Sequence, residues 1–479
     1  MNILLVMCDS LPAQFCGHHG DSACATPHLD ALAERGVTFE RAYCNSPLCT
    51  PSRASVLTGQ YASTLGCLDN AGSFSSEWPT VAHCLSAAGY DTTIIGKMHL
   101  VGHDQWHGFD ERVCLDTDYT TGYDVFNYRL AYDWEQPVAG NPVGHNWMGP
   151  SYVKDSAWDD FSLHYDRDVR IHEAALKFLN DRGPESKPFF ACVSYHAPHN
   201  PFWIPEEFRR RFSEIELDLP ALPEGIDTCQ SVMDQWLDAF HYRDEIRDRL
   251  MTEENLRWLY ETCYGMVYDL DQRLGALIEA LEVNGLADNT AVIFISDHGD
   301  MMAQRGMIQK RYFYEHSVRV PLVAYVPDGG AAGSRLTTPV SLVDLLPTFT
   351  DLTGTNAPSD LPGMSLRPAI ESGIEPEART LFCEYHGEGV HAPCFLAIRD
   401  NLRYFYIHGH EERLYDIDSD PMQYHDLSED ARYVDRVRAF RQELSARFDP
   451  ERIAQDALQS QRNRIFIYSN SGHEQAGSS

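Results

Sequence analysis

Short apolar runs alternate with longer stretches of helical spacing along most of the chain. The short runs are typical of strands buried on both faces, and they cover residues 3–7, 92–95, 189–195, 291–295 and 322–326. Apolar residues recur with helical spacing over residues 26–36, 168–179 and 253–283. Strands that alternate with helices predict an α/β fold with a large, central, mostly parallel (mixed) sheet sandwiched by helices.

The pattern changes after about residue 377. Short runs at 380–384, 394–398 and 403–407, followed by a helical stretch at 431–448, predict a smaller antiparallel sheet with a terminal helix. We therefore divide the chain into a larger domain over 1–376 and a C-terminal small-sheet subdomain and tail over 377–479. Residues 463–479 are polar apart from a short apolar run, so we expect this tail to be loose or to dock on a partner subunit.

Two stretches have little periodicity, residues 116–162 and 205–249. The first is rich in Tyr, Trp, Asp and Gly, and the second is irregular and acidic. We expect both to be insertions over the functional edge of the sheet, where loops carry specificity.

The charge of the chain narrows the range of partners. It has 38 Lys and Arg against 71 Asp and Glu, a formal net charge of −33. This balance disfavours nucleic acid and anionic membranes as partners. The chain starts without a basic leader, and no segment reaches the ~18 apolar residues of a membrane span. Its thirteen cysteines form no CxxC pair, which fits a reducing compartment, so we expect a cytoplasmic protein.

Acidic residues follow two of the predicted strands. Asp9 comes directly after the first strand, and Asp297 and His298 come directly after the strand at 291–295. The carboxyl ends of parallel strands meet at one edge of a sheet, where ligands bind. Two carboxylates and an imidazole suit a divalent ion such as Ca²⁺, Mg²⁺ or Mn²⁺. A single Asp in such a place is more often a cap or turn residue, but two such strand ends favour a metal.

A thiol lies at the start of a short predicted helix in residues 48–59. Pro51 has the backbone angle of a first helical position, and Gly59 can adopt the left-handed cap that ends a helix. A helix start offers unpaired N–H groups and a positive dipole end, which suit an anion. A lone Cys49 would most simply be a buried core residue, but Arg53 four residues later and the strand-end carboxylates argue for chemistry.

Cationic and imidazole side chains follow the other strands. Lys97 and His99 come after the strand at 92–95, His199 comes after the strand at 189–195, and Lys310 lies beyond the second acidic loop. Each alone is more simply a surface charge or a loop histidine. With a metal they would form a pocket that stabilises an oxyanion and donates protons, as transfer of a sulfuryl or phosphoryl group requires.

The sequence Cys49-Thr50-Pro51-Ser52-Arg53, followed by Leu57-Thr58-Gly59, resembles the signature of type I sulfatases in the alkaline-phosphatase-like superfamily. The resemblance extends from residue 2 to about residue 427. Residues 96–102, with 383–385 and 388–390, look most like the choline-sulfatase branch.

This resemblance implies a modified nucleophile. Cys49 would be oxidised after translation to formylglycine by a maturation enzyme that recognises Pro51 and Arg53. The aldehyde hydrate attacks the sulfuryl group through one hydroxyl, and deprotonation of the second hydroxyl expels sulfate. The substrate would be a small-molecule sulfate ester.

The resemblance also implies roles for the other residues. The metal ligands would be Asp9, the modified Cys49, Asp297 and His298. The catalytic residues would be Arg53, which orients the hydrate; Lys97 and Lys310, which bind sulfate oxygens; His99, the base; and His199, the acid. His103 is a weaker pocket candidate, and His196 lies beside the motif position of His199.

Two departures from the family pattern affect the metal and the substrate. Ser10 follows Asp9 where many members have a second Asp, and His298 stands where many have Asn. The softer, less negative site favours Mn²⁺, with Ca²⁺ possible and Mg²⁺ less suited. The same pattern resembles phosphonate monoester hydrolases, so hydrolysis of phosphonate monoesters or phosphodiesters is an alternative function. A non-catalytic binding protein is a third.

The alcohol released and the assembly are left open by the sequence. Aromatic and acidic residues between 106 and 134 could hold a quaternary ammonium group by cation–π attraction, or could simply pack a long loop. The apolar run in the tail and the resemblance imply a homo-oligomer with contacts near the C-terminus.

Overall fold

The computed structural model describes residues 1–21, 23, 26–114, 149–154, 162–241 and 243–470. Its centre is an eight-stranded sheet. In spatial order the strands are β10 (Ser334–Leu336), β2 (Val37–Phe39), β9 (Leu322–Tyr325), β7 (Thr290–Ser296), β1 (Asn2–Cys8), β6 (Phe189–Ser194), β4 (Asp91–Gly96) and β5 (Glu111–Val113).

Most neighbours in this sheet run parallel. β1 pairs in parallel with β7 on one side and β6 on the other, with Met7 opposite Ile295 and Ser194. The pairs β4–β6, β4–β5 and β10–β2 are also parallel, whereas β9 runs antiparallel to both β7 and β2. The predicted mostly parallel, mixed sheet is confirmed.

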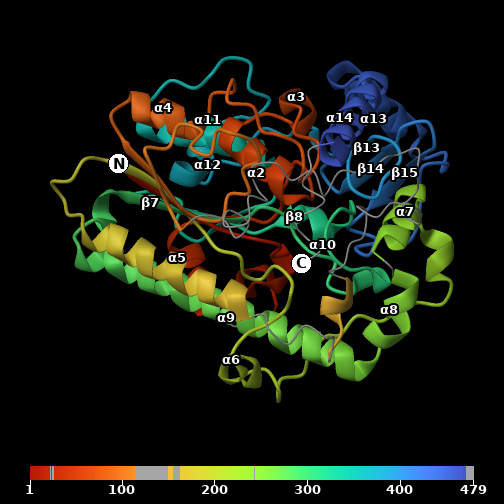
Figure 1. Cartoon of the computed structure of the whole chain (residues 1–479), viewed down its shortest axis with the longest axis horizontal. Helices are drawn as coiled ribbons and strands as arrows, with labels where there is room; N and C mark the ends of the chain where they lie inside the picture. The colour runs from red at the N-terminus through yellow and green to blue at the C-terminus, as the bar shows by residue number, and fades with distance from the viewer. Residues whose placement is uncertain (22, 24–25, 115–148, 155–161, 242, 471–479) are drawn as a thin grey trace.

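Helices cover both faces of the sheet (Figure 1). One face carries α1 (Pro27–Arg35), α5 (Ser162–Asn180) and α9 (Glu253–Val283), and the other carries α2 (Cys49–Thr58), α4 (Val81–Ala87) and α11 (Leu345–Thr353). Side chains alternate between the two faces along β1, and both faces are apolar: Leu4 and Val6 belong to one buried core, and Ile3, Leu5 and Met7 belong to the other. The sheet therefore needs helices on both faces.

The C-terminal region forms the predicted second sheet. Its four antiparallel strands are β12 (Leu381–Tyr385), β13 (Cys394–Arg399), β14 (Leu402–Ile407) and β15 (Glu411–Asp416). They lie with α13 (Val434–Arg447) and α14 (Pro450–Asn470) at one side of the molecule (Figure 1). Buried Arg403 of β14 donates to Glu315 of the larger unit at 2.7 Å, so the two units share a polar core, and the division at residue 377 stays a prediction.

Two sequence expectations need correction. The tail from residue 463 is not loose up to residue 470, because it continues α14, a helix that the sequence pattern did not reveal. Residues 205–249 are not irregular throughout, because they contain α6 (Glu206–Arg210), α7 (Val232–Phe240) and the start of α8 (Arg243–Leu250), although 211–231 have no α-helix or strand. A capping box formed by Ser231 and Asp234 starts α7.

The remaining elements are short. They are β3 (Ala42–Tyr43), β8 (Arg319–Val320), β11 (Val340–Ser341), α3 (Ala62–Leu65), α10 (Glu315–Val318) and α12 (Arg367–Ser372). The predicted insertion at 116–162 lies mostly outside the described residues, and so do the aromatic and acidic residues from 115 to 134. Within that insertion, residues Gly149–Tyr152 form a 3₁₀ turn.

In the described ranges, no helix combines the length and apolar character that crossing a bilayer requires. The twelve cysteines that the structure describes are all free.

Candidate active site

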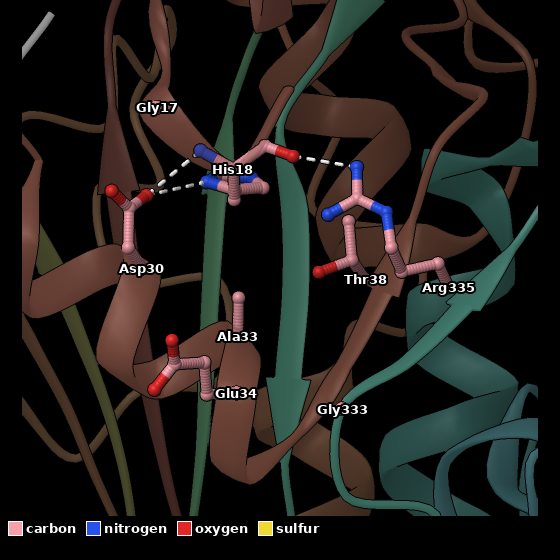
Figure 2. A pocket seen from close by; sticks show the side chains of 8 residues that line it. All are labelled: Gly17, His18, Asp30, Ala33, Glu34, Thr38, Gly333 and Arg335. Carbon is pink, nitrogen blue, oxygen red and sulfur yellow. Dashed lines mark hydrogen bonds and ion pairs between the residues drawn. The ribbon is translucent and has the colours of Figure 1, made fainter. Parts of the chain in front are cut away.

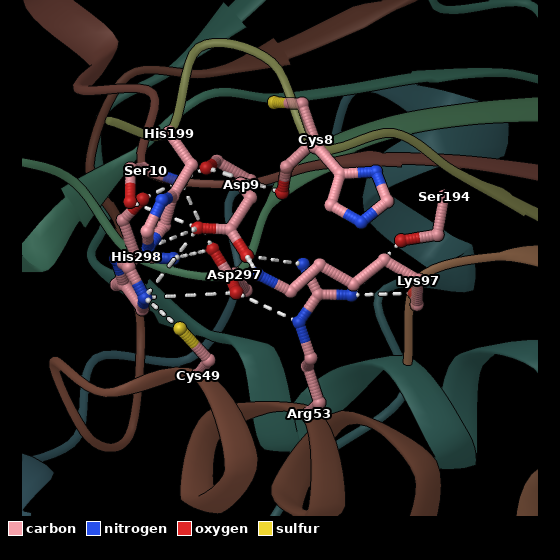
Figure 3. Close-up of polar contacts among 12 residues, drawn as sticks. Cys8, Asp9, Ser10, Cys49, Arg53, Lys97, Ser194, His199, Asp297 and His298 are labelled. Atoms are coloured by element: carbon pink, nitrogen blue, oxygen red, sulfur yellow. Dashed lines mark hydrogen bonds and ion pairs between the residues drawn. The ribbon is translucent and has the colours of Figure 1, made fainter. Parts of the chain in front are cut away.

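Four neighbouring parallel strands end at one edge of the sheet, in the order β7, β1, β6, β4. Each is followed by a predicted site residue: Asp297 after β7, Asp9 after β1, His199 after β6 and Lys97 after β4. Figure 3 shows these side chains converging above the start of α2, which supplies Cys49. The sequence-predicted convergence of separate loops is therefore present.

The predicted metal ligands form a compact cluster. One ligand atom from each of Asp9, Cys49, Asp297 and His298 lies within 4.8 Å of all the others, and all four residues are buried. His298 Nε2 is 3.3 Å from Cys49 Sγ and 3.6 Å from Asp297 Oδ2. Two buried carboxylates beside an imidazole and a thiol are a donor set that fits a divalent cation.

Arg53 joins the two carboxylates from behind. Its Nε donates to Asp297 Oδ2 at 2.8 Å and its Nη2 donates to Asp9 Oδ2 at 2.9 Å. Its Nη1 donates to the carbonyl oxygen of Lys97 at 2.8 Å and to Ser194 Oγ at 2.9 Å. The guanidinium thus holds the ends of four strands in register, a role that the sequence did not indicate.

Two buried ammonium groups complete the charge balance. Lys97 Nζ lies 2.7 Å from Asp9 Oδ2, and Lys310 Nζ lies 3.2 Å from Cys49 Sγ. Burial and Asp9 act to raise the pKa of Cys49, but Lys310, Lys97 and His298 outweigh them and hold that pKa well below its ordinary value. The same position would therefore favour an anionic oxygen.

His199 is tied to Lys310. Its Nε2 lies 2.6 Å from Lys310 Nζ, and its Nδ1 contacts the carbonyl oxygen of Asn200. Burial, and next Lys310, lower the pKa of His199 to about 4, so the ring is neutral near pH 7. The carbonyl requires a proton on Nδ1, and Nε2 then accepts from the ammonium.

The other predicted histidines differ in placement. His99 is half-buried, two residues beyond Lys97, with a left-handed backbone φ of 55°. His103 is exposed. His196 is buried and its Nδ1 lies 3.0 Å from Asp168 Oδ1, whose carboxylate also accepts from two backbone N–H groups. This contact gives His196 a structural role in the loop after β6.

The start of α2 differs slightly from the sequence expectation. The helix begins at Cys49, so Pro51 is its third residue rather than its first. No side chain of the preceding residue caps it, and instead the Thr50 N–H donates to Asn70 Oδ1 at 2.9 Å. Gly59 ends the helix with a φ of 65°, as predicted.

Close packing explains two glycines of this edge. A Cβ on Gly96, the last residue of β4, would lie 2.2 Å from the carbonyl oxygen of Ser194, and one on Gly299 would lie 2.0 Å from that of His316. Only glycine allows the loops after β4 and β7 to pass this close to neighbouring backbone.

Sequence reasoning missed several residues around the site. Tyr152 donates to Asp300 Oδ2 at 2.5 Å, which fastens the 3₁₀ turn Gly149–Tyr152 to the loop after β7. The ring of His164 is parallel to that of His199, with centroids 6.3 Å apart. No local motif marks Tyr152, His164 or Asn70, so only the folded chain could reveal them.

A separate surface pocket of about 330 Å³ lies at the β10 edge of the sheet (Figure 2). His18 there donates through its backbone N–H to Asp30 Oδ1 at 2.8 Å, and its carbonyl oxygen accepts from Arg335 Nη2 at 2.5 Å. None of the predicted catalytic residues lines this pocket.

Comparison with known proteins agrees with the site. The family model described as sulfatase matches residues 1–355, and the model described as the C-terminal part of N-sulphoglucosamine sulphohydrolase matches residues 303–449. The chain therefore belongs to the sulfatase family, and it has the alkaline-phosphatase-like fold. It is a sulfuric ester hydrolase.

Two curated relatives and one solved structure show the range of similarity. The chain is 33% identical to the choline-sulfatase of Rhizobium meliloti, over 98% of this chain and 90% of that protein. It is 28% identical to an N-acetylglucosamine-6-O-sulfatase of Bacteroides thetaiotaomicron, over 92% of this chain and 85% of the relative. The crystal structure of the phosphonate monoester hydrolase of Agrobacterium radiobacter superposes on this chain with a TM-score of 0.74 at 24% identity. The superposition covers 93% of this chain and 95% of the hydrolase, so the two proteins share the fold.

Proposed function

We propose that this enzyme hydrolyses a small-molecule sulfate monoester through a formylglycine derived from Cys49, releasing sulfate and an alcohol. The observation that carries the proposal is the position of Cys49 Sγ. It lies 3.3 Å from His298 Nε2 and 3.2 Å from Lys310 Nζ, inside a buried cluster with two carboxylates. A nucleophile there meets cationic groups that would bind a tetrahedral anion.

The metal and the aldehyde supply complementary chemistry. A bound ion, Mn²⁺ or Ca²⁺ by the donor set, would supply Lewis-acid chemistry, and the hydrated aldehyde would supply the nucleophilic oxygen. Asp9, Asp297, His298 and position 49 would hold the ion. Among the chain's own residues, Arg53 fixes both carboxylates at 2.8–2.9 Å, so the ligands are in place before substrate enters.

Proton transfer is assigned to three side chains. Lys310 binds a sulfate oxygen and, through its 2.6 Å contact, supplies His199 with the proton that the leaving alcohol oxygen takes up. Lys97 binds a second sulfate oxygen. His99 acts as the base that removes a proton from position 49 when sulfate is released.

The choline-sulfatase relative favours an alcohol that carries a quaternary ammonium group. Its identity extends over 98% of this chain, beyond the catalytic signature. Choline sulfate is therefore the first substrate to test, against an uncharged alkyl sulfate of similar size. Equal kcat/KM for the two would exclude a dedicated site for the cation.

The decisive experiment combines mass spectrometry with kinetics. After co-expression with a formylglycine-generating enzyme, the peptide that contains Cys49 should be about 18 Da lighter than the thiol form. Cys49→Ala should fold and lose turnover. A fully active preparation in which Cys49 is unmodified would exclude the formylglycine mechanism.

Hydrolysis of phosphonate monoesters or phosphodiesters is the second candidate. Ser10 follows Asp9 and donates to its Oδ1 at 2.9 Å, so the site has one carboxylate fewer than the sulfatases with two consecutive aspartates. Matched aryl sulfate, phosphonate and phosphodiester substrates separate the two candidates. Much faster turnover of the phosphorus esters would favour the second.

A further inference from the structure

The last described helix reaches the region of the catalytic cysteine. From α14, Arg464 places Nη1 and Nη2 at 2.5 and 2.6 Å from the two carboxylate oxygens of Asp69. The arginine is 7% exposed and the aspartate 2%. A buried bidentate ion pair between residues so far apart in sequence fixes their relative position strongly.

Asp69 precedes a residue that touches the catalytic helix. Asn70 accepts from the backbone N–H of Thr50 at 2.9 Å, and Thr50 is the neighbour of Cys49. The backbone N–H of Asn70 in turn donates to Glu388 Oε1 at 3.2 Å. The turn formed by Asp69 and Asn70, called here the 69–70 turn, therefore holds the first residues of α2.

The same turn connects to Lys310. Arg311 donates through Nε to Glu388 Oε2 at 3.1 Å, and its backbone N–H donates to the carbonyl oxygen of Pro47 at 3.0 Å. Because Arg311 follows Lys310, both sides of the contact between Lys310 and Cys49 depend on the 69–70 turn.

The charges around Asn70 balance in two pairs. Two buried carboxylates flank it, and Arg311 neutralises Glu388 while Arg464 neutralises Asp69. Burial, and next the negative charge of Asp69, raise the pKa of Glu388 well above its ordinary value, so the two carboxylates interact electrostatically. Without Arg464, Asp69 would be a buried charge without its counter-ion and would have to move towards water.

We propose that Arg464 is a positioning residue of the active site. It neutralises Asp69 and thereby keeps Asn70 hydrogen-bonded to the start of α2, which aligns position 49 with Lys310. The kinetic part of this proposal rests on the proposed sulfatase function, whereas the hydrogen bond itself can be measured without any substrate.

The test compares two Arg→Met variants of the same helix in the full-length chain. Arg464→Met removes the buried pair, and Arg452→Met removes an exposed pair with Asp456 of 3.5 Å. Hydrogen exchange of the Thr50 amide, resolved by peptide fragmentation, should accelerate at least tenfold in Arg464→Met and stay at the wild-type rate in Arg452→Met. Peptides from β1 report any global loss of stability.

Kinetics on a sulfate ester supply the second readout. Displacement of a catalytic group by a remote substitution can cost up to about 10²-fold, so Arg464→Met should lower kcat by about 10- to 100-fold with KM within about threefold. Asp69→Asn/Arg464→Met, which removes both charges, should recover most of the loss, and Arg464→Lys should recover part of it. The double variant also keeps the test valid if Arg464→Met fails to fold.

The outcomes separate the two proposals. Wild-type kcat and Thr50 exchange in Arg464→Met would overturn the positioning role, as would a double variant that folds but stays as slow as the single one. If the wild type turns over no sulfate ester while Thr50 exchange still responds to Arg464→Met, the proposed function fails and the positioning contact stands.

Discussion

Lys310 and His199 form a cation–imidazole contact in which Nζ lies 2.6 Å from Nε2. The depressed pKa of His199, about 4, makes the imidazole the acceptor of this contact in the resting enzyme. In the mechanism proposed above, lysine rather than a histidinium ion therefore stores the proton that the leaving group takes up.

This relationship predicts a leaving-group dependence. His199→Gln should lower kcat/KM for an alkyl sulfate by about 10²- to 10³-fold, because general acid catalysis contributes on that scale. For 4-nitrophenyl sulfate the loss should be at least tenfold smaller, since nitrophenolate leaves without protonation. Lys310→Met should slow the hydrolysis of both substrates, because it also removes the ammonium group that is proposed to bind a sulfate oxygen. Equal losses on the two esters in His199→Gln would contradict the acid role.

A second prediction concerns the arginine behind the carboxylates. Breaking a buried ion pair by removing one partner costs about 3–5 kcal/mol, so Arg53→Met should lower the free energy of unfolding by that order. Because the ligand cluster becomes more negative, Mn²⁺ should raise the melting temperature of the variant more than that of wild type. The wild type and the variant should both be prepared with Cys49 as the unmodified thiol, because Arg53 belongs to the signature that the maturation enzyme would recognise. An equal or smaller Mn²⁺ shift in the variant would refute this account.

The unconverted chain should bind soft cations. With Cys49 as a thiol, the cluster offers a sulfur, an imidazole and two carboxylates, a set that favours Zn²⁺ and Cd²⁺ over Ca²⁺. Titration with Cd²⁺ should give an ultraviolet thiolate charge-transfer band that is absent in Cys49→Ser and in fully converted protein. A band of equal intensity in Cys49→Ser would assign the binding to other cysteines.

Buried histidines should make the fold sensitive to acid. Burial lowers the pKa of His107 to about 4 in the folded chain, below its ordinary value of 6.5. The carboxylate of Asp104, with Oδ2 3.6 Å from His107 Nδ1, acts in the opposite direction and offsets only part of this shift. Between those two pH values the unfolded chain therefore binds more protons than the folded chain. The contribution of neutral His107 to the free energy of unfolding is fully present above pH 6.5 and is lost as the pH falls towards 4. His107 alone should lower the free energy of unfolding by about 2 kcal/mol between pH 7 and pH 5.

His107→Phe tests this directly. The imidazole stacks on Phe74 with centroids 4.0 Å apart, so a phenyl ring can keep the packing without titrating. Urea unfolding at pH 7 and pH 5 should show a smaller loss of stability in the variant than in wild type. An unchanged difference between the two pH values would exclude His107 as a source of the acid sensitivity.

The parts of the fold that the sequence predicted are those with strong local signals. The five predicted strands are short apolar runs, and α9 has a long helical periodicity. Residues that follow parallel strands share one edge of the sheet, which explains why Asp9, Lys97 and Asp297 could be brought together in advance. The direction of β9 was not predictable, because a strand buried on both faces has the same pattern in either direction.

Other features depend on partners distant in sequence. β3, β8 and β11 have two residues each, too few for any periodicity. α14 is rich in polar residues, and its anchor Arg464 is understandable only beside Asp69, which no local pattern indicates. Tyr152 and Asn70 acquire their roles in the same way, through single contacts with Asp300 and Thr50.

The hydrogen bonds of Arg53 to four different partners have a consequence for protein engineering. Its guanidinium needs a carboxylate from each of two adjacent strands, together with a serine hydroxyl and a backbone carbonyl from two more. The short stretch around Cys49 is therefore not a portable catalytic module. Transplanted alone into another scaffold, it would carry Cys49 and Arg53 but none of the four partners that hold the arginine.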